Sequence, residues 1–385
     1  MKRHKPPFRA DHVGSFLRTT AIKDARAKRD TGEIGAEQLE AIENAEIAKI
    51  IRKQEACGLQ LATDGEFRRS WWHFDFLCGL DGVAMKQIDH GIQFAGVQTK
   101  AERPDVVGRV GFSGHPMIDH FKFLKANARV TSKMTIPSPT LLHFRFGRAS
   151  ISKTLYPDLD EFFDDLGATY AKVVKAFYDA GCRYLQFDDT IWAFLCSGKE
   201  RAQSRQRGDD PDELPEKYAR MINQALAAKP ADMTITTHIC RGNFRSTWIS
   251  EGGYEPVAET LFGKLNYDGY FLEYDTERAG GFEPLRFVPK GDKQIVLGLV
   301  SSKVGALESK DDIKRRIEEA TKYVALDQLC LSPQCGFAST EEGNVLSEHE
   351  QWAKLGMIVE LADEVWRWPS FRGATNGSGP LGPAR

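Results

Sequence analysis

The sequence lacks the features that mark membrane, secreted and nucleic-acid-binding proteins. No run reaches the ~18 apolar residues of a membrane span, and the basic residues 1–11 are not followed by the apolar stretch of a secretory signal. Neither sign of charge is in excess, since 52 Lys and Arg face 54 Asp and Glu. That balance argues against nucleic acid or a membrane surface as a partner. We therefore expect a cytoplasmic protein that acts on small molecules.

Cysteine is scarce, and a glycine-rich phosphate turn is absent. The seven cysteines are odd in number and widely spaced, which is unlike the disulfide framework of small secreted chains. The thiols are therefore expected to be free or bound to metal. A doubly wound open sheet would usually carry a Gly-rich turn after an early strand, and none is present.

What the 385 residues do contain is an alternation of short β-rich apolar runs with longer segments of helical spacing. This alternation is typical of βαβ units and a parallel sheet. Eight strands are predicted, at residues 10–16, 59–66, 133–137, 184–188, 233–240, 270–274, 294–301 and 329–335. Eight units predict an α/β fold, a closed (β/α)₈ TIM barrel, and the length suits one large barrel with insertions.

Helix boundaries follow from local chemistry. Gly58 and Gly181 each stand between a helical pattern and a predicted strand, where a left-handed residue ends a helix. Ser309 and Asp312 form a capping box ahead of a predicted helix over 313–324.

Two stretches fall outside a minimal barrel. Residues 82–127 are expected to be a β-hairpin insertion between the second and third units, serving as a lid or as an oligomer contact. Residues 373–385 are rich in Gly and Pro, which predicts a mobile tail. The remaining 1–372, insertion included, is predicted to form a single domain.

Four side chains near the ends of late strands could share one metal ion. His238 and Cys240 are two residues apart on a predicted strand and so face the same side. Glu273 and Cys335 end two other strands, and the strands of a barrel present their carboxyl ends at one face. Two thiolates, an imidazole and a carboxylate suit Zn²⁺ rather than Mg²⁺ or Ca²⁺. The alternative is that these are four separately buried residues.

The same segments resemble motifs of the cobalamin-independent methionine synthase family, in its catalytic C-terminal barrel. The Thr-His-x-Cys strand, a following strand Glu and a Pro-x-Cys-Gly segment match the zinc ligands, which become His238, Cys240, Glu273 and Cys335. The resemblance spans nearly the whole chain and implies a (β/α)₈ fold, Zn²⁺ as cofactor and homocysteine as the acceptor thiol.

Three further motifs carry substrate roles by the same resemblance. Asp11-His-Val-Gly-Ser-Phe16 is similar to the opening strand, and Ser15 then contacts the carboxylate of homocysteine. Glu66 in Asp64-Gly-Glu66 and Asp188 in Gln186-Phe-Asp-Asp189 then bind its amino group. The chemistry agrees, because carboxylates suit an ammonium group. The alternative reading is that these are capping or surface carboxylates.

Ligand softness separates two classes of zinc enzyme. Zn²⁺ with two thiolates and a carboxylate carries about one net negative charge by formal counting, so it is a weak Lewis acid that still holds a thiol as thiolate. Hydrolases prefer neutral His-rich ligation that acidifies water. The predicted ligand set, with its two thiolates, therefore favours an enzyme that alkylates sulfur over a hydrolase.

The chain departs from the family pattern in two places. It has the length of one barrel, whereas the full-length family enzyme has two. The family's proton-donating His of the seventh unit is replaced in Gly298-Leu-Val-Ser-Ser-Lys303, where Ser302 or Lys303 lies near the expected position.

Trp71 and Trp72, with neighbouring arginines, form an aromatic cluster directly after Glu66. Indole faces stack on flat heterocycles, so this cluster is a candidate for binding a pterin donor. The alternative is an aromatic loop that seals the barrel mouth.

The sequence thus predicts a zinc-dependent methyltransferase that makes methionine from homocysteine, with a methyl-tetrahydrofolate as donor. Alkyl transfer to another thiol or from a corrinoid, a zinc hydrolase or lyase, and a non-catalytic binding protein remain as alternatives.

Overall fold

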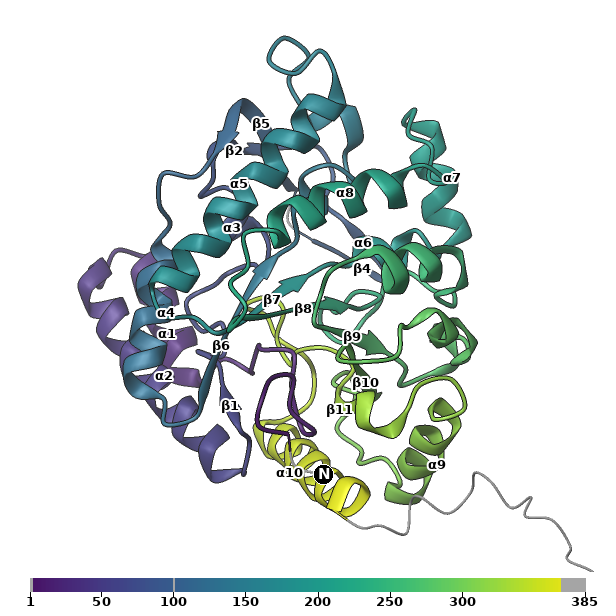
Figure 1. Ribbon diagram of the computed structural model, residues 1–385. Coiled ribbons are helices and arrows are strands. Elements are labelled where there is room, and N and C mark those ends of the chain that lie inside the picture. The colour runs from purple at the N-terminus through teal and green to yellow at the C-terminus, as the bar shows by residue number, and fades with distance from the viewer. Residues whose placement is uncertain (1–2, 100, 368–385) are drawn as a thin grey trace, which may run out of the picture.

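The computed structural model describes residues 3–99 and 101–367 and has a parallel sheet at its centre (Figure 1). Seven strands pair side by side in one order along this sheet. They are β1 (Leu61–Ala62), β6 (Thr131–Pro137), β7 (Tyr184–Asp188), β8 (Thr234–Ile239), β9 (Gly269–Glu273), β10 (Gln294–Val300) and β11 (Leu329–Pro333). The fold is therefore α/β, as expected from the alternation of patterns.

Residues 10–16, predicted as the first strand, do not form a regular strand. A parallel bridge joins Ala10 to Leu331 of β11, and at the other end the Phe16 amide donates to the Gly65 carbonyl (3.0 Å). The backbone leaves extended geometry at Gly14, whose φ is +145°. The segment thus lies between β11 and β1, but in the described residues no continuous ladder closes the sheet.

The second predicted strand, 59–66, is also shorter than expected. Its ladder ends at β1 because the buried Gln54 side chain takes both backbone groups of Thr63, accepting from its amide and donating to its carbonyl (2.9 Å each). Gly65 and Glu66 then adopt positive φ values of 69° and 60°. A side chain here replaces a neighbouring strand as the hydrogen-bond partner.

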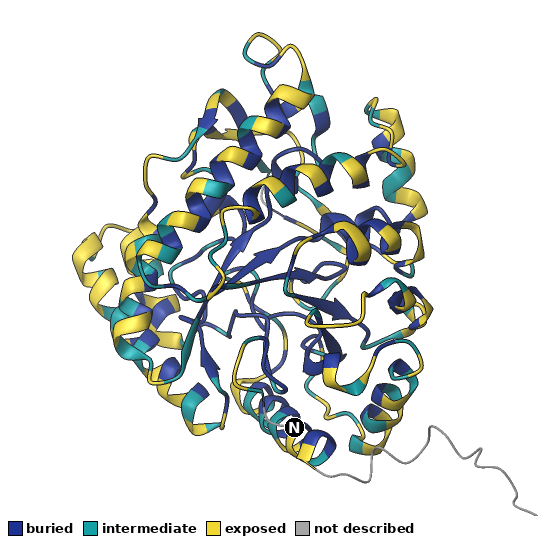
Figure 2. Cartoon of the chain, viewed as in Figure 1, coloured by how far each residue is buried: buried dark blue, intermediate teal, exposed yellow. Residues whose placement is uncertain are grey.

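Helices surround the sheet and bury one face each, so that the strands are buried and the outer helix faces are exposed (Figure 2). The longer helices are α1 (Thr20–Asp30), α2 (Ala36–Ala56), α4 (Pro116–Asn127), α5 (Leu159–Asp179), α8 (Leu214–Leu226), α9 (Lys310–Ala320) and α10 (Glu348–Arg367). The shorter helices are α3 (Phe74–Leu77), α6 (Ile191–Phe194) and α7 (Gly198–Gln206). Helical turns fill several remaining connections, at η1 (Pro139–Leu142), η2 (Gly147–Ser150), η3 (Glu255–Val257), η4 (Glu259–Lys264), η5 (Glu277–Ala279), η6 (Glu283–Phe287) and η7 (Leu326–Gln328).

The expected helix ends are present. Gly58 and Gly181 follow α2 and α5 with φ values of 90° and 93°, and the Ser309 hydroxyl accepts from the Asp312 amide at the start of α9 (3.3 Å). None of the helices in the described residues has the length and apolar character needed to cross a bilayer. The tail predicted at 373–385 lies outside the described residues.

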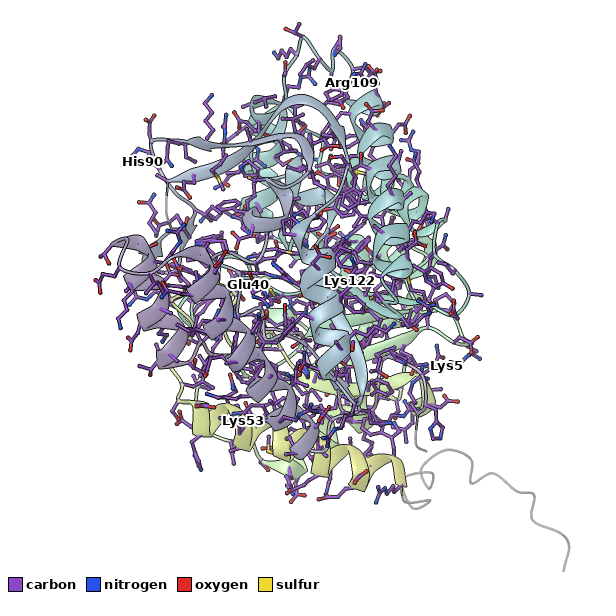
Figure 3. The ribbon with its side chains drawn as sticks, turned by 90° about the vertical axis from the view of Figure 1, so that its left-hand side faces the viewer. Lys5, Glu40, Lys53, His90, Arg109 and Lys122 are labelled. Atoms are coloured by element: carbon purple, nitrogen blue, oxygen red, sulfur yellow. The ribbon has the colours of Figure 1, made fainter. Side chains whose placement is uncertain are left out.

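The inserted β structure is shorter than predicted. Antiparallel strands β2 (Asp81–Gln87) and β5 (Glu102–Gly111) enclose a small hairpin of β3 (Gln93–Phe94) and β4 (Val97–Gln98). Figures 1 and 3 show this insertion at the end of the molecule opposite α10, with His90 and Arg109 labelled on it in Figure 3.

The prediction of β structure up to residue 127 was wrong, because residues 116–127 form α4. The His115 ring accepts from the Met117 amide (3.1 Å), and Pro116 occupies the first turn, where a missing N–H costs nothing. Met117, Phe121 and Leu124 then point into the core at helical spacing. α4 is thus a crossover helix of the fold and not part of the insertion.

A buried ion pair between Asp11 and Lys133 ties residues 10–16 to β6. The Asp11 carboxylate accepts from the Lys133 ammonium (3.1 Å), the Tyr184 hydroxyl (3.0 Å) and the Phe8 and His12 amides (3.0 and 2.8 Å). Both charged side chains are fully buried, so each is the main counter-charge of the other.

We expect Asp11→Ala to lower the free energy of unfolding by about 3–5 kcal/mol, because it leaves the Lys133 ammonium buried and unpaired. Urea denaturation followed by circular dichroism measures this loss. Asp24→Ala on the exposed face of α1 is the control. The double variant Asp11→Ala/Lys133→Met should recover part of the loss; an Asp11→Ala protein as stable as the control would contradict the anchoring role.

Candidate metal centre and pocket

Three of the four predicted metal ligands meet at the carboxyl ends of the strands. His238 is on β8, Cys240 follows it, and Cys335 follows β11. The donor atoms of these three side chains all lie within 4.8 Å of one another, and all three residues are buried. β8 and β11 are not neighbours in the sheet, so the curvature of the sheet is what brings their ends together.

The hydrogen bonding of this group suits a metal ion. Neither ring nitrogen of His238 has a hydrogen-bond partner, although buried imidazoles are normally satisfied. The interaction between the two thiols lowers the pKa of Cys335 well below its usual range and raises that of Cys240. An unpartnered imidazole beside two sulfurs, one of them readily ionised, is a donor set that fits Zn²⁺.

Glu273, the fourth predicted ligand, ends β9 and is fully buried next to this group. One carboxylate oxygen, Oε2, accepts from the Arg241 amide (2.8 Å). The other, Oε1, lies 3.6 Å from the Arg278 guanidinium and 3.9 Å from the Lys303 ammonium. Glu273 is not in the cluster of three and instead faces two cations.

Of the two residues considered for proton donation, only Lys303 has a free donor. The Lys303 ammonium is buried and has no hydrogen-bond partner. The Ser302 hydroxyl donates to the Gln334 side chain (2.6 Å), which precedes Cys335. Lys303 therefore adds positive charge next to Glu273, and Ser302 supports the loop that carries Cys335.

The three residues predicted to bind substrate line the same pocket as the three donors. Ser15, Glu66 and Asp188 line it together with His238, Cys240 and Cys335, and Asp188 is the register partner of His238 where β7 pairs with β8. The structure thus brings together six of the seven residues predicted for metal and substrate in one cavity.

Glu66 reaches this pocket through unusual backbone geometry. Its φ of 60° is unfavourable for a residue with a side chain. The Thr135 hydroxyl donates to Glu66 Oε1 (2.9 Å), whereas Oε2 is buried with no hydrogen bond and lies 3.6 Å from Arg69. Because Glu66 Oε2 makes no hydrogen bond, it can accept one from a bound ligand.

Asp188 supplies a second carboxylate. Gln186 donates to its Oδ1 (2.7 Å), and burial, with a contribution from the charge of Glu66, raises the pKa of Asp188 to about 7. Two carboxylates that face one buried cavity favour a cationic ligand, because a positive charge relieves their mutual repulsion.

Ser15 is tied to the loop that carries Cys335. Its hydroxyl accepts from the Ala338 amide (3.3 Å). A Cβ on Gly336 would lie 2.0 Å from the same oxygen, so only glycine permits this approach. The serine and the cysteine are therefore positioned together.

Trp71 and Trp72 also line the pocket. Trp71 is buried and stacks on Phe74, with ring centroids 5.1 Å apart and planes 13° apart. It shares an aromatic cluster with Phe94, on β3 of the insertion, and Phe244. This packing matches the alternative of a loop that seals the mouth.

Among the pocket residues that sequence reasoning did not single out are Phe94 and Arg145. Phe94 comes from the inserted hairpin and Arg145 from the connection after η1. Neither is at the end of a strand of the parallel sheet, so the strand-end rule used for the other residues does not point to them. The wall contributed by Phe94 favours the lid interpretation of the insertion.

Comparison with known families is consistent with this arrangement. The family model described as "Cobalamin-independent synthase, Catalytic domain" matches residues 8–364. The chain belongs to this family. One similar protein is YxjG of Bacillus subtilis (strain 168), which is described as an uncharacterized protein. It is 57% identical to this chain over 369 residues, which cover 95% of this chain and 97% of YxjG.

Two other members extend the comparison. The crystal structure of the "Putative Vitamin-B12 Independent Methionine Synthase from Listeria monocytogenes" is similar with a TM-score of 0.77 at 49% identity, covering 94% of this chain and 99% of that chain. The 5-methyltetrahydropteroyltriglutamate–homocysteine methyltransferase of Thermotoga petrophila is 23% identical over 94% of this chain but only 44% of its own length. This chain therefore corresponds to less than half of that longer family member.

We expect the purified protein to bind about one zinc ion per chain, and His238→Ala or Cys335→Ser to abolish most of that binding, because each removes one donor of the cluster. Elemental analysis after dialysis against a weak chelator gives the stoichiometry. Cys182→Ser, which alters a buried thiol outside the cluster, is the control. Full zinc content in His238→Ala would rule out this metal site.

Proposed function

We propose that this protein is a zinc-dependent methyltransferase that converts homocysteine to methionine, with a methyl-tetrahydrofolate as the methyl donor. The observation that carries the proposal is a single pocket that contains both the His238, Cys240 and Cys335 donors and the carboxylates of Glu66 and Asp188. Membership of the cobalamin-independent synthase family supports the methyl transfer, and the names of its relatives support homocysteine as acceptor. The proposal includes closure of the sheet into a full barrel by residues 10–16.

The metal would be held by His238, Cys240 and Cys335, with Glu273 as the fourth protein ligand. Bound zinc would lower the pKa of an incoming thiol without making the site strongly electrophilic, because thiolate ligands neutralise its charge. Glu273 reaches this role only if its Oε1 turns from Arg278 and Lys303 towards the thiols.

The amino-acid part of the substrate is held by carboxyl groups of the same pocket. Glu66 Oε2, which makes no hydrogen bond, and the carboxylate of Asp188 accept from the substrate ammonium group. Ser15, at the base of the Cys335 loop, donates to the substrate carboxylate. These contacts direct the sulfur towards the donor cluster, and the methyl group then arrives from the open side in an in-line displacement.

The departing amine of the donor needs a proton. Lys303 remains the predicted source, since its ammonium makes no hydrogen bond and lies 3.9 Å from Glu273, while the hydroxyl of Ser302 donates to Gln334. The aromatic surface of Trp72, which is partly buried on the pocket wall, is the predicted stacking partner for the pterin.

The composition of the pocket argues against the alternatives. Two thiol donors are unlike the His-rich ligation of zinc hydrolases. The buried carboxyl groups of Glu66 and Asp188 favour a thiol that also carries an amino group, because an ammonium group supplies them with a charged hydrogen-bond donor that other thiols lack. An amino-acid thiol satisfies both conditions.

The direct test is methionine formation by the zinc-loaded protein. Homocysteine with 5-methyltetrahydrofolate, supplied with one or three glutamates, should give methionine detectable by mass spectrometry, and the product should disappear in Cys335→Ser. Methylcobalamin is assayed in parallel as the corrinoid donor. Absence of methionine with every donor, at full zinc content, would disprove the proposed reaction.

We expect Glu66→Gln to raise the KM for homocysteine about 10–100-fold, since a hydrogen bond to a charged group contributes about 1.5–3 kcal/mol. Steady-state kinetics measure the change, and zinc content should stay at the wild-type level. As a control, 4-mercaptobutyrate, which lacks the amino group, should react equally slowly with both proteins. An unchanged KM for homocysteine would show that Glu66 does not bind the substrate.

A further inference from the structure

The two cysteines of the donor cluster stand on loops that no strand pairing joins. Cys240 follows β8 and Cys335 follows β11, and β9 and β10 lie between these strands in the sheet (Figure 1). Curvature of the sheet brings the two loops near one another, but zinc ligation needs both sulfurs at about 2.3 Å from the metal. Contacts between the loops therefore have to fix the last part of the distance.

A buried asparagine side chain makes such a contact. Asn243, three residues after Cys240, is 6% exposed, and its Nδ2 donates to the carbonyl of Gly336 (2.8 Å). The bond also fixes the orientation of the amide, because the reverse orientation would set an oxygen against the carbonyl oxygen. Gly336 directly follows Cys335, so this side chain joins the backbone near one thiol to the backbone next to the other.

The loop that carries Asn243 is closed by its own backbone. The Arg241 carbonyl accepts from the Ile249 amide (2.9 Å), and Gly242 has a left-handed φ of 95°. A Cβ on Gly242 would lie 2.8 Å from Ile249 Cγ2 and 3.0 Å from Phe94 Cε1, so glycine is required at this turn. Asn243 thus extends from a backbone that is held in one conformation.

The backbone that receives this hydrogen bond is held as well. The Ser15 carbonyl accepts from the Phe337 amide (3.0 Å), and the close approach of Ser15 Oγ to Gly336 leaves no room for a side chain. Residues 336 and 337 are therefore fixed by the segment of Ser15 and by Asn243, and the position of the preceding Cys335 depends on both.

The other end of the amide does not explain why an asparagine is present. Asn243 Oδ1 is buried and has no hydrogen-bond partner among the described residues, and a buried acceptor in this state lowers stability. Asn243 also lines the pocket that holds the donor cluster. A polar residue that is half satisfied at such a place is typical of a functional site, because a purely structural position would be filled by an apolar side chain.

We propose that Asn243 is a positioning residue of the metal centre, and that its hydrogen bond to Gly336 sets the approach of the Cys335 sulfur to that of Cys240. This inference rests on the proposed function, in that the cluster holds zinc. Groups that orient the ligands of a metal without touching it commonly contribute about 10–100-fold to metal affinity. Asn243 would make this contribution through the backbone of the neighbouring loop.

The test uses two variants of Asn243. Asn243→Asp keeps the shape of the side chain but sets an oxygen against the Gly336 carbonyl, and Asn243→Ala removes the donor without adding a charge. We expect both to bind zinc about 10–100-fold more weakly than the wild type, as measured by competition with a chromophoric chelator. Thermal melting of the metal-free proteins checks that each variant is folded.

A spectroscopic measurement separates positioning from a loss of folding. With saturating Co²⁺ in place of zinc, the sulfur-to-cobalt charge-transfer absorption reports the thiolates bound to the metal. We expect this absorption to fall to roughly half in both variants, because one of the two thiolates no longer reaches the metal. A merely structural role of Asn243 would lower the melting temperature and leave this absorption unchanged.

Asn344→Ala is the matched control, because Asn344 joins the same two loops farther from the thiols. Its Oδ1 accepts from the Ser246 amide (3.2 Å), and it lies outside the pocket lining. The zinc affinity and the cobalt spectrum of this variant should equal those of the wild type. An equal loss in Asn344→Ala would show that any contact between the loops suffices and that Asn243 does not have the proposed role.

Neither measurement needs turnover, so failure of this inference differs from failure of the proposed function. If methionine is formed but both Asn243 variants keep the zinc affinity and cobalt spectrum of the wild type, the positioning role is wrong and the reaction stands. If no methionine is formed but both variants lose zinc affinity and charge-transfer absorption, the positioning role stands and the reaction is wrong. A wild-type protein that binds no zinc would overturn both.

Discussion

The pocket depends on one geometric constraint: the carboxyl ends of strands that are distant in the sheet converge at one mouth. β8 and β11 are separated by two strands, yet the donor atoms that follow them come within 4.8 Å. Parallel strands all end on the same side, and curvature of the sheet shortens the distance across it. The segment 10–16, bridged to β11 at Ala10, adds Ser15 to the same mouth. The His238, Cys240 and Cys335 cluster and Ser15 are thus brought together by the sheet and by the segments that end on it.

Charge is the second organising feature of the pocket. Glu66 and Asp188 place carboxyl groups on a space that favours a cation, whereas Arg278 and Lys303 are positive and lie beside Glu273. Arg145 also lines the pocket, and the charge of Glu200 acts on its guanidinium. The pocket and its immediate surroundings thus carry groups of both signs.

Much of this arrangement could be predicted from the sequence, and the exceptions have physical causes. The strands from β6 to β11 are short, largely buried segments rich in β-branched and aromatic residues, and their bounds differ from the prediction by only a few residues. Residues 10–16 and 59–66 were harder, because Asp11 and Gln54 bind backbone groups that a strand would otherwise pair. The glycine-rich segment ahead of α4 favoured a hairpin interpretation, so the helical spacing of the apolar residues in α4 was overlooked.

The same distinction between strand pattern and tertiary contacts applies to the site. Two-residue alternation and strand ends were enough to select His238, Cys240 and Cys335. Alternation could not indicate that Glu273 is held by Arg241, Arg278 and Lys303, since Arg241 and Lys303 follow other strands and Arg278 lies in the connection after β9. Phe94 and Arg145 belong to an insertion and a connection, where only tertiary contacts decide what faces the pocket.

The inserted hairpin has a consequence for how this fold can diversify. Its residues, including Phe94, shape the outer wall, while every donor atom of the cluster belongs to the sheet or the turn after it. Exchanging the hairpin for one of another length or polarity would change which molecules are admitted while leaving the reacting groups in place. Selection can thus act on the outer wall of the pocket without moving the donor cluster, since the two are encoded in separate stretches of the chain.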